Sequence, residues 1–218
     1  MTNPSDILPM ATCFSFLFTE WFWAFWQFLA IVVSAILIVR QVKSQQNANL
    51  ITVFNALETR WESEMMLKAR LLVCVRYLRD LTNDVKAQVS GEAVYVSNFF
   101  EELGIDLKYK ILPEDLIWEH YRYLIIPYYT LLKSKTAMYQ QEKQEASTFS
   151  LFGFLYKRML AVSQLNGENF KDLEVGEVLD FLSGELDRLK FRSEGLPNFL
   201  PTKIMEEFEK MLNESKKV

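Results

Sequence analysis

The sequence predicts an all-α protein with one membrane-spanning helix near its amino terminus, followed by a bundle of about six helices. Three observations support this fold class. The stretch Trp21–Val39 is almost purely apolar. After it, apolar residues recur every three or four positions, which is the spacing of one helix face. Apart from the short run 94–96, no segment alternates convincingly between apolar and polar residues as a half-buried strand would.

Apolar and charged residues are distributed unevenly along the chain. They make up 50% and 24% of the sequence, but the charges are nearly absent from the amino-terminal part. We therefore expect a short tail, a membrane helix, a polar stalk, a helical domain, a polar linker and carboxy-terminal helices. These parts cover residues 1–13, 14–39, 40–49, 50–138, 139–148 and 149–218.

The apolar stretch has the length and chemistry of a membrane helix. As an α-helix, Trp21–Val39 would extend about 28 Å, against a hydrocarbon core of about 30 Å. Its Leu, Ile, Phe and Val side chains favour insertion by roughly 3–7 kcal/mol, and the polar Gln27 and Ser34 do not cancel this. A signal peptide is disfavoured because no Lys or Arg precedes Arg40. A buried core helix would need a partner domain to cover every face.

The charges that flank this stretch predict its orientation. Arg40 and Lys43 follow it directly, whereas the short tail, residues 1–13, carries only Asp6. By the positive-inside rule, the amino terminus lies outside and the carboxy-terminal domain lies in the cytoplasm. Cys13 and Cys74 would then lie on opposite sides of the membrane and could not pair.

Three small or polar residues, Gln27, Ala30 and Ser34, share one stripe of the expected membrane helix. Small residues allow close helix packing, and a glutamine can hydrogen-bond across a helix pair. The stripe is therefore a candidate self-association face. Chance occurrence in a long helix is the alternative, and the sequence does not decide between the two.

Periodicity and turn signals place the helices of the soluble part. Ser63 is a candidate N-cap, Gly104 a candidate helix end, and Pro127 is expected to kink or split its helix. The expected apolar helix faces cover about residues 50–61, 64–78, 93–103, 114–132, 149–165, 173–191 and 202–213.

The sequence offers little for catalysis or metal binding. Its seven glycines never fall within four residues of one another, which excludes a P-loop, a dinucleotide fingerprint and a nucleophile elbow. The single histidine, His120, cannot form a histidine-rich metal site, and Cys74 lies on an apolar stripe. We expect no cofactor. The net charge of −4 and pI of about 5.3 argue against a nucleic-acid partner.

An aromatic run, Phe149–Tyr156, precedes Lys157 and Arg158. It is too short to span a bilayer. The run either belongs to the bundle core or lies in the membrane interface with the two cations at the headgroups.

Several helix-packing patterns resemble a family of bacterial membrane-anchored proteins, domain of unknown function 4760. They are Trp61-x-Ser63-Glu64-Met65 leading to Ala69-Arg70, the segment 96–104, and Trp118 followed by Pro127. The resemblance covers roughly residues 20–140. It implies a bacterial inner-membrane location but brings no activity and no catalytic residues.

From the residues themselves, Trp61, Arg70, Trp118 and Tyr121 are expected to form a packing or partner surface. Glu64 and Arg70 are expected to form ion pairs at the bundle surface, each contributing little.

Three functional hypotheses follow. The first is a single-pass, membrane-anchored cytoplasmic interaction or scaffold module whose partners are the bilayer and either another protein or further copies of itself. The second is an oligomeric, channel-like or membrane-perturbing effector with a cytoplasmic sensing domain. The third is an all-α enzyme working through Glu119, His120 and nearby tyrosines.

Overall fold

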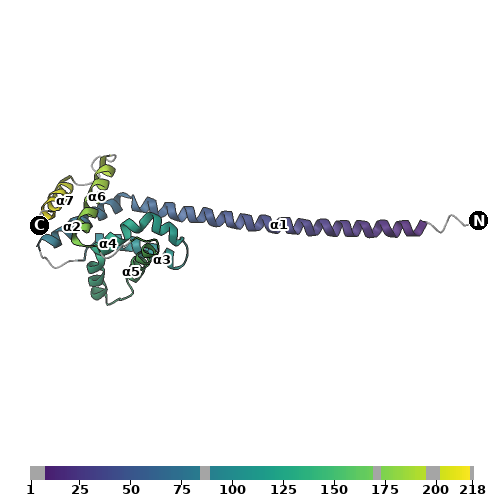
Figure 1. The fold of residues 1–218 in the computed structure, drawn as a ribbon, viewed down its shortest axis with the longest axis horizontal. Helices are drawn as coiled ribbons and strands as arrows, with labels where there is room; N and C mark the ends of the chain where they lie inside the picture. Colours follow the sequence, from purple (N-terminus) through teal and green to yellow (C-terminus); the bar gives the residue numbers. More distant parts are fainter. Residues whose placement is uncertain (1–7, 84–88, 169–172, 195–201, 217–218) are drawn as a thin grey trace, which may run out of the picture. The chain divides into compact units, whose positions relative to one another are not determined.

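The computed structural model describes residues 8–83, 89–168, 173–194 and 202–216, and their regular secondary structure is entirely helical. This confirms the all-α prediction, and six helices follow the first one within these residues (Figure 1). The helices are α1 (Leu8–Trp61), α2 (Glu64–Asn83), α3 (Gly91–Lys108), α4 (Glu114–Lys143), α5 (Ser150–Leu165), α6 (Val175–Glu194) and α7 (Thr202–Ser215).

The first helix, α1, joins four of the predicted segments, because it begins at Leu8 within the tail expected over 1–13. It runs through the membrane helix expected over 14–39, the stalk expected over 40–49 and the helix expected after it. The stalk does not interrupt it, because this polar stretch contains neither Gly nor Pro. In the part Glu20–Trp61, an apolar window has a mean hydropathy of 2.3 and none of it is buried. Among the described helices, α1 alone is long and apolar enough to cross a membrane.

The contacts between Cα atoms divide the chain into two compact units, Met1–Thr52 and Val53–Val218. The second unit includes the carboxy-terminal helices, so the predicted linker 139–148 does not separate two compact parts. Helix α4 continues into this linker because its polar residues are good helix formers. It ends at Lys143, and the next residue, Gln144, caps it with a left-handed φ of 55°.

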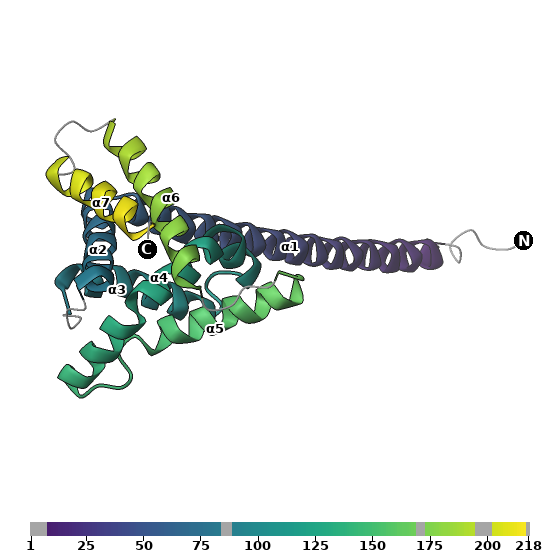
Figure 2. The same cartoon turned by 60° about the vertical axis from the view of Figure 1, so that its left-hand side comes forward.

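Within the second unit, α2–α7 pack around an apolar core. Helix α3 lies along α5 and both contact α4, while α2 contacts α3, α6 and α7 (Figure 2). The largest fully buried side chains are mostly aromatic: Tyr121, Tyr128, Phe99, Phe100, Phe152 and Phe208.

Gly104 does not end a helix, contrary to the prediction. Helix α3 continues to Lys108, and Gly104 lies buried inside it. A Cβ atom at this position would collide with the backbone carbonyl of Leu151 in α5. The glycine is therefore needed for the close approach of α3 and α5, a tertiary requirement that the sequence does not reveal.

Two other expectations concern helix starts and breaks. The N-cap at Ser63 is confirmed, because its Oγ accepts a hydrogen bond from the N–H of Met66 at 3.3 Å. Pro127 does not split α4, which is one helix from Glu114 to Lys143 with the proline buried inside it.

The aromatic run before Lys157 and Arg158 belongs mainly to the core. Phe149, Phe152 and Tyr156 are buried, and Phe154 is the exposed member. The core interpretation is thus confirmed for these three side chains.

Candidate functional site

Arg70 is buried rather than exposed, which corrects the prediction of a surface ion pair with Glu64. Its relative exposure is 2%, and Glu64 pairs with Lys68 instead. Helix geometry explains the burial, because Arg70 lies three residues after Leu67 and four before Cys74, on the same inward face of α2.

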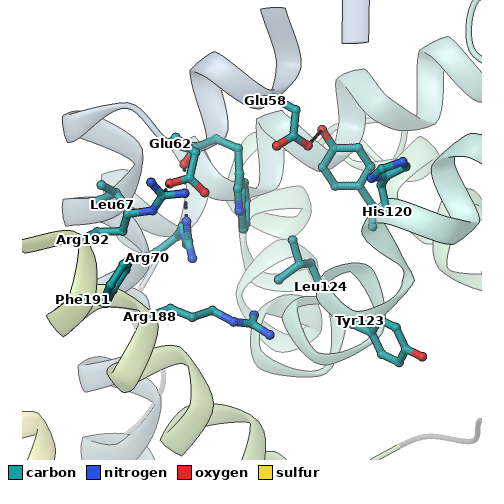
Figure 3. Close-up of a pocket in the computed structure, with 12 residues that line it drawn as sticks. Glu58, Glu62, Leu67, Arg70, His120, Tyr123, Leu124, Arg188, Phe191 and Arg192 are labelled. Carbon is teal, nitrogen blue, oxygen red and sulfur yellow. Dashed lines mark hydrogen bonds and ion pairs between the residues drawn. The ribbon is translucent and has the colours of Figure 1, made fainter. Parts of the chain in front are cut away.

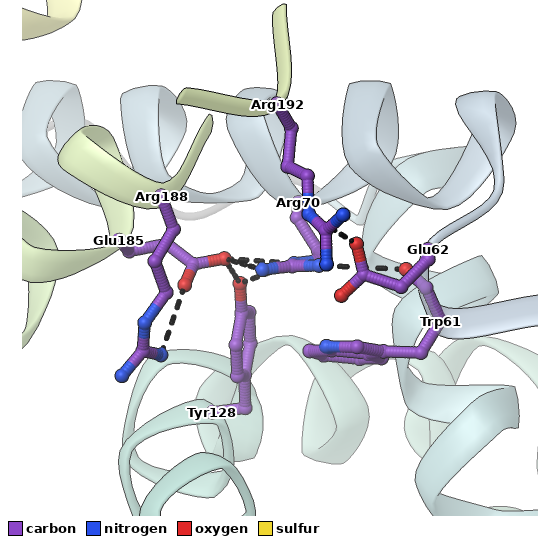
Figure 4. A network of polar contacts seen from close by, with 7 residues as sticks. All are labelled: Trp61, Glu62, Arg70, Tyr128, Glu185, Arg188 and Arg192. Carbon is purple, nitrogen blue, oxygen red and sulfur yellow. Dashed lines mark hydrogen bonds and ion pairs between the residues drawn. The ribbon is translucent and has the colours of Figure 1, made fainter. Parts of the chain in front are cut away.

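The guanidinium of Arg70 pairs with a carboxylate from a distant helix, Glu185 of α6, which is fully buried (Figure 4). Its Nη2 lies 2.5 Å and its Nε 2.7 Å from Oε1 of Glu185. The hydroxyl of Tyr128 in α4 donates to the same Oε1 at 2.7 Å. One carboxylate oxygen therefore ties α2, α4 and α6 together.

Trp61 forms the other side of the Arg70 site. The guanidinium carbon of Arg70 lies 4.2 Å from the centre of the Trp61 ring, and Nη1 donates to the Trp61 carbonyl at 3.4 Å. A desolvated cation over an indole ring contributes about 2 kcal/mol. The ring centroids of Phe99 and Phe100 lie 4.8 Å and 5.6 Å from that of Trp61. Trp61 therefore anchors the end of α1 to α2 and α3.

Burial and charge set the protonation of this cluster. Burial, together with the charge of Glu185, raises the pKa of Tyr128 well above its ordinary value, so Tyr128 stays a neutral donor. Burial also raises the pKa of Cys74, so its sulfur is held as the thiol and not as the nucleophilic thiolate. For Arg70, burial lowers the pKa, but Tyr128 and Glu185 more than compensate, and the net direction is upward.

One carboxylate oxygen of Glu185 has no hydrogen-bond partner. This oxygen, Oε2, is buried, and Nη1 of Arg188 lies 3.6 Å from it. The Arg188 side chain is 57% exposed, so it reaches from the buried cluster towards solvent.

An open pocket of about 420 Å³ lies beside this cluster (Figure 3). Volumes of this size are typical of small-molecule sites. Its lining is mixed, with acidic, basic and aromatic side chains from α1, α2, α4 and α6. The lining residues are Glu58, Trp61, Glu62, Leu67, Arg70, His120, Tyr121, Tyr123, Leu124, Arg188, Phe191 and Arg192.

Three of the four residues predicted as a packing or partner surface meet at this pocket: Trp61, Arg70 and Tyr121. Tyr121 is buried, and its hydroxyl donates to Oε1 of Glu58 at 2.6 Å. Burial raises the pKa of Tyr121, and the bond to Glu58 raises it further. His120 is exposed and contacts Phe54, with 4.9 Å between the ring centroids.

Trp118 does not line the pocket. It is half-buried, and its indole N–H donates to Oγ of Ser163 at 3.1 Å, while the guanidinium of Arg122 lies 3.8 Å from its ring centre. It therefore links α4 to α5.

The remaining predicted residues, Gln27, Ala30 and Ser34, lie in the other compact unit. All three are exposed in α1.

The sequence does not predict four residues of this site, namely Tyr128, Glu185, Arg188 and Arg192. The sequence does contain a sign that Glu185 is buried. This residue lies within the apolar stripe that Leu182, Leu186 and Leu189 form. An acid on one inward face and an arginine on another predict a buried pair, since a buried charge needs a partner.

Among the described side chains, no group of three or more His, Cys, Asp or Glu residues is arranged to hold a metal ion.

No known family model, curated protein or solved structure matches this chain. The resemblance noted over residues 20–140 stays a prediction.

Proposed function

We propose that the chain is a single-pass membrane protein whose helical unit, Val53–Val218, serves as a cytoplasmic interaction or scaffold module at the bacterial inner membrane. The observation that carries the proposal is the exposed apolar surface of α1. Every side chain from Trp21 to Val39 is exposed, although the window has a mean hydropathy of 2.3. Exposing such a surface to water would cost free energy, whereas a bilayer surrounds it with hydrocarbon.

Burial argues against the other common interpretation of an apolar helix. A core helix of a soluble protein is covered by its neighbours, but none of the apolar window in α1 is buried. The proposed orientation rests on Arg40 and Lys43, which follow the apolar stretch and favour the cytoplasmic side.

We further propose that the module works as an oligomer through Gln27, Ala30 and Ser34. These side chains are exposed on one stripe of α1, where no other part of the described chain covers them. Close helix packing there would bury Gln27 against a second copy, and its amide would gain a partner.

Single-molecule photobleaching of the full chain in nanodiscs tests this proposal. The wild type should bleach in several steps, and a Gln27→Leu, Ser34→Leu variant should shift towards single steps. Val32→Leu with Ile36→Leu is the matched control, because these residues lie on the opposite side of the helix at 100° per residue. Single-step bleaching of the wild type would refute self-association.

A channel-like or membrane-perturbing effector is the second candidate. The observation that favours it is the pair of polar side chains, Gln27 and Ser34, within the apolar stretch, since polar residues inside a membrane often line pathways. Conductance of the purified chain in planar bilayers separates the two candidates. A scaffold should give no current, whereas an effector should give current that the Gln27→Leu, Ser34→Leu variant reduces.

A further inference from the structure

The pocket beside Arg70 has two walls of opposite charge. Glu58, in the last turn of α1, and Glu62, just after that helix, are four residues apart, and the N–H of Glu62 donates to the carbonyl of Glu58 at 3.0 Å. Arg188 and Arg192 are also four residues apart, on α6. Residues with this spacing lie on the same face of a helix, so the pocket has an acidic pair on one side and a basic pair on the other.

Only one acid and one arginine of these pairs meet directly. Nε of Arg192 lies 2.9 Å from Oε2 of Glu62, so these two charges neutralise each other. No ion pair is recorded between Glu58 and Arg188, and Figure 3 shows them on different sides of the opening. The pocket therefore has one completed acid–arginine pair and one open pair.

Glu58 and Arg188 each have a partner, but both can form further hydrogen bonds. Glu58 accepts the Tyr121 hydroxyl on Oε1, and its second oxygen is available. Arg188 forms an ion pair with Oε2 of Glu185, but the 3.6 Å separation is too long for a hydrogen bond, so the N–H groups of the guanidinium can still donate. A carboxylate in the pocket would offer Arg188 the bidentate geometry that guanidinium groups prefer.

The geometry points to a binding site for a small zwitterion of the amino-acid type, with its ammonium group at Glu58 and its carboxylate at Arg188. Such a ligand completes the open pair as Glu62 and Arg192 complete the other. A simple anion fits less well, because Glu58 would repel it, and a simple cation would meet Arg188. Elsewhere in the lining, Trp61, Tyr121 and Leu124 supply apolar surface for a hydrocarbon or aromatic side chain. The site lies entirely within Val53–Val218, so it does not depend on the proposed membrane anchoring.

Calorimetric titration of the full chain in nanodiscs tests this inference, with the standard amino acids as probes, added one at a time. At least one apolar or aromatic amino acid should bind with a stoichiometry of one per chain. Its one-ended analogues, which for leucine are 4-methylpentanoate and 3-methylbutylamine, should each bind at least about tenfold more weakly, because each loses one charge-assisted contact.

Variants assign the two ends of the ligand. Glu58→Gln and Arg188→Gln should each weaken binding by about ten- to a hundredfold. Arg76→Gln and Glu177→Gln, outside the pocket, should leave the affinity unchanged. The titrations with one-ended analogues use the wild-type chain, so they test the inference even if Arg188→Gln disturbs folding. Absence of binding by every amino acid at millimolar concentration would overturn the inference. Equal affinity for the zwitterion and its carboxylate-only analogue would also overturn it.

Discussion

Removing the carboxylate of Glu185 should strongly destabilise the helical unit. Arg70 is 2% exposed, and in Glu185→Leu it loses the hydrogen bond from Nε and the ion pair from Nη2 to Oε1, while the Tyr128 hydroxyl loses its acceptor. Breaking a buried ion pair by removing one partner costs about 3–5 kcal/mol. For a unit of this size, each kcal/mol lowers the melting temperature by about 2–4 °C, so a loss of 4 kcal/mol corresponds to roughly 8–16 °C.

A second variant separates the effect of the charges on stability from the effect of the volume that the two side chains fill. Arg70→Met combined with Glu185→Leu removes both charges and keeps most of the volume, so it should recover most of the lost stability. Asp187→Leu, on the exposed face of the same helix, is the control and should change stability by less than about 0.5 kcal/mol.

Urea unfolding of the fragment 53–218, followed by far-ultraviolet circular dichroism, gives these free energies. The reasoning is refuted if Glu185→Leu lowers the free energy of unfolding by less than 1 kcal/mol. A double variant no more stable than Glu185→Leu would show instead that the unpaired charge of Arg70 does not cause the loss.

Four further predictions concern stability and folding. The pKa of Tyr128 and of Cys74 is raised in the folded chain, so the unfolded chain releases these protons first, near pH 9 to 10. Stability should therefore be full below about pH 9 and fall above it, and an unchanged urea midpoint from pH 8 to 10.5 would contradict this. Gly104→Ala should destabilise by about 1–3 kcal/mol because of the Leu151 carbonyl, whereas Gly184→Ala, in open space on α6, should stabilise by about 0.5–1 kcal/mol. Thermal melts of the two variants should move in opposite directions. Trp61→Leu should cost more than about 2 kcal/mol, seen as a lower urea midpoint, because it removes the ring beneath Arg70. The fragment 53–218 should fold alone with a cooperative melt, and a broad, non-cooperative melt would count against a separate compact unit.

Local sequence signals predicted the fold class well, because helix faces and caps are local. The apolar faces of the helices and the Ser63 cap follow from spacing and residue type, and the structure has both. The prediction that α3 ends at Gly104 was wrong because a buried glycine can permit close helix packing instead of ending a helix. The linker at 139–148 is predicted to be a separate segment because its polar residues suggest an interruption, although polar residues without Gly or Pro continue a helix readily, as α4 does to Lys143.

The candidate site depended on pairings that sequence spacing does not give. Arg70 and Glu185 lie 115 positions apart, and only the packing of α2 against α6 brings them together. Arg70 is predicted at the surface because it is placed on a helix face other than the apolar stripe, although it lies three residues after Leu67 and four before Cys74, on that stripe. Tyr121 and Trp61 were found because aromatic residues at helical spacing indicate a core, but their common pocket is a property of the tertiary fold.

We propose that the exposed apolar surface of α1 lies in a lipid bilayer. Alkaline carbonate washing of membranes from bacteria that express the full chain tests it most directly. The wild type should stay with the membranes. Leu29→Arg with Val33→Arg should be released, because two central arginines cost about 5–7 kcal/mol against an insertion gain of roughly 3–7 kcal/mol. Asn55→Arg, outside the apolar stretch, should behave as the wild type. Release of the intact wild-type chain into the carbonate wash would contradict the claim.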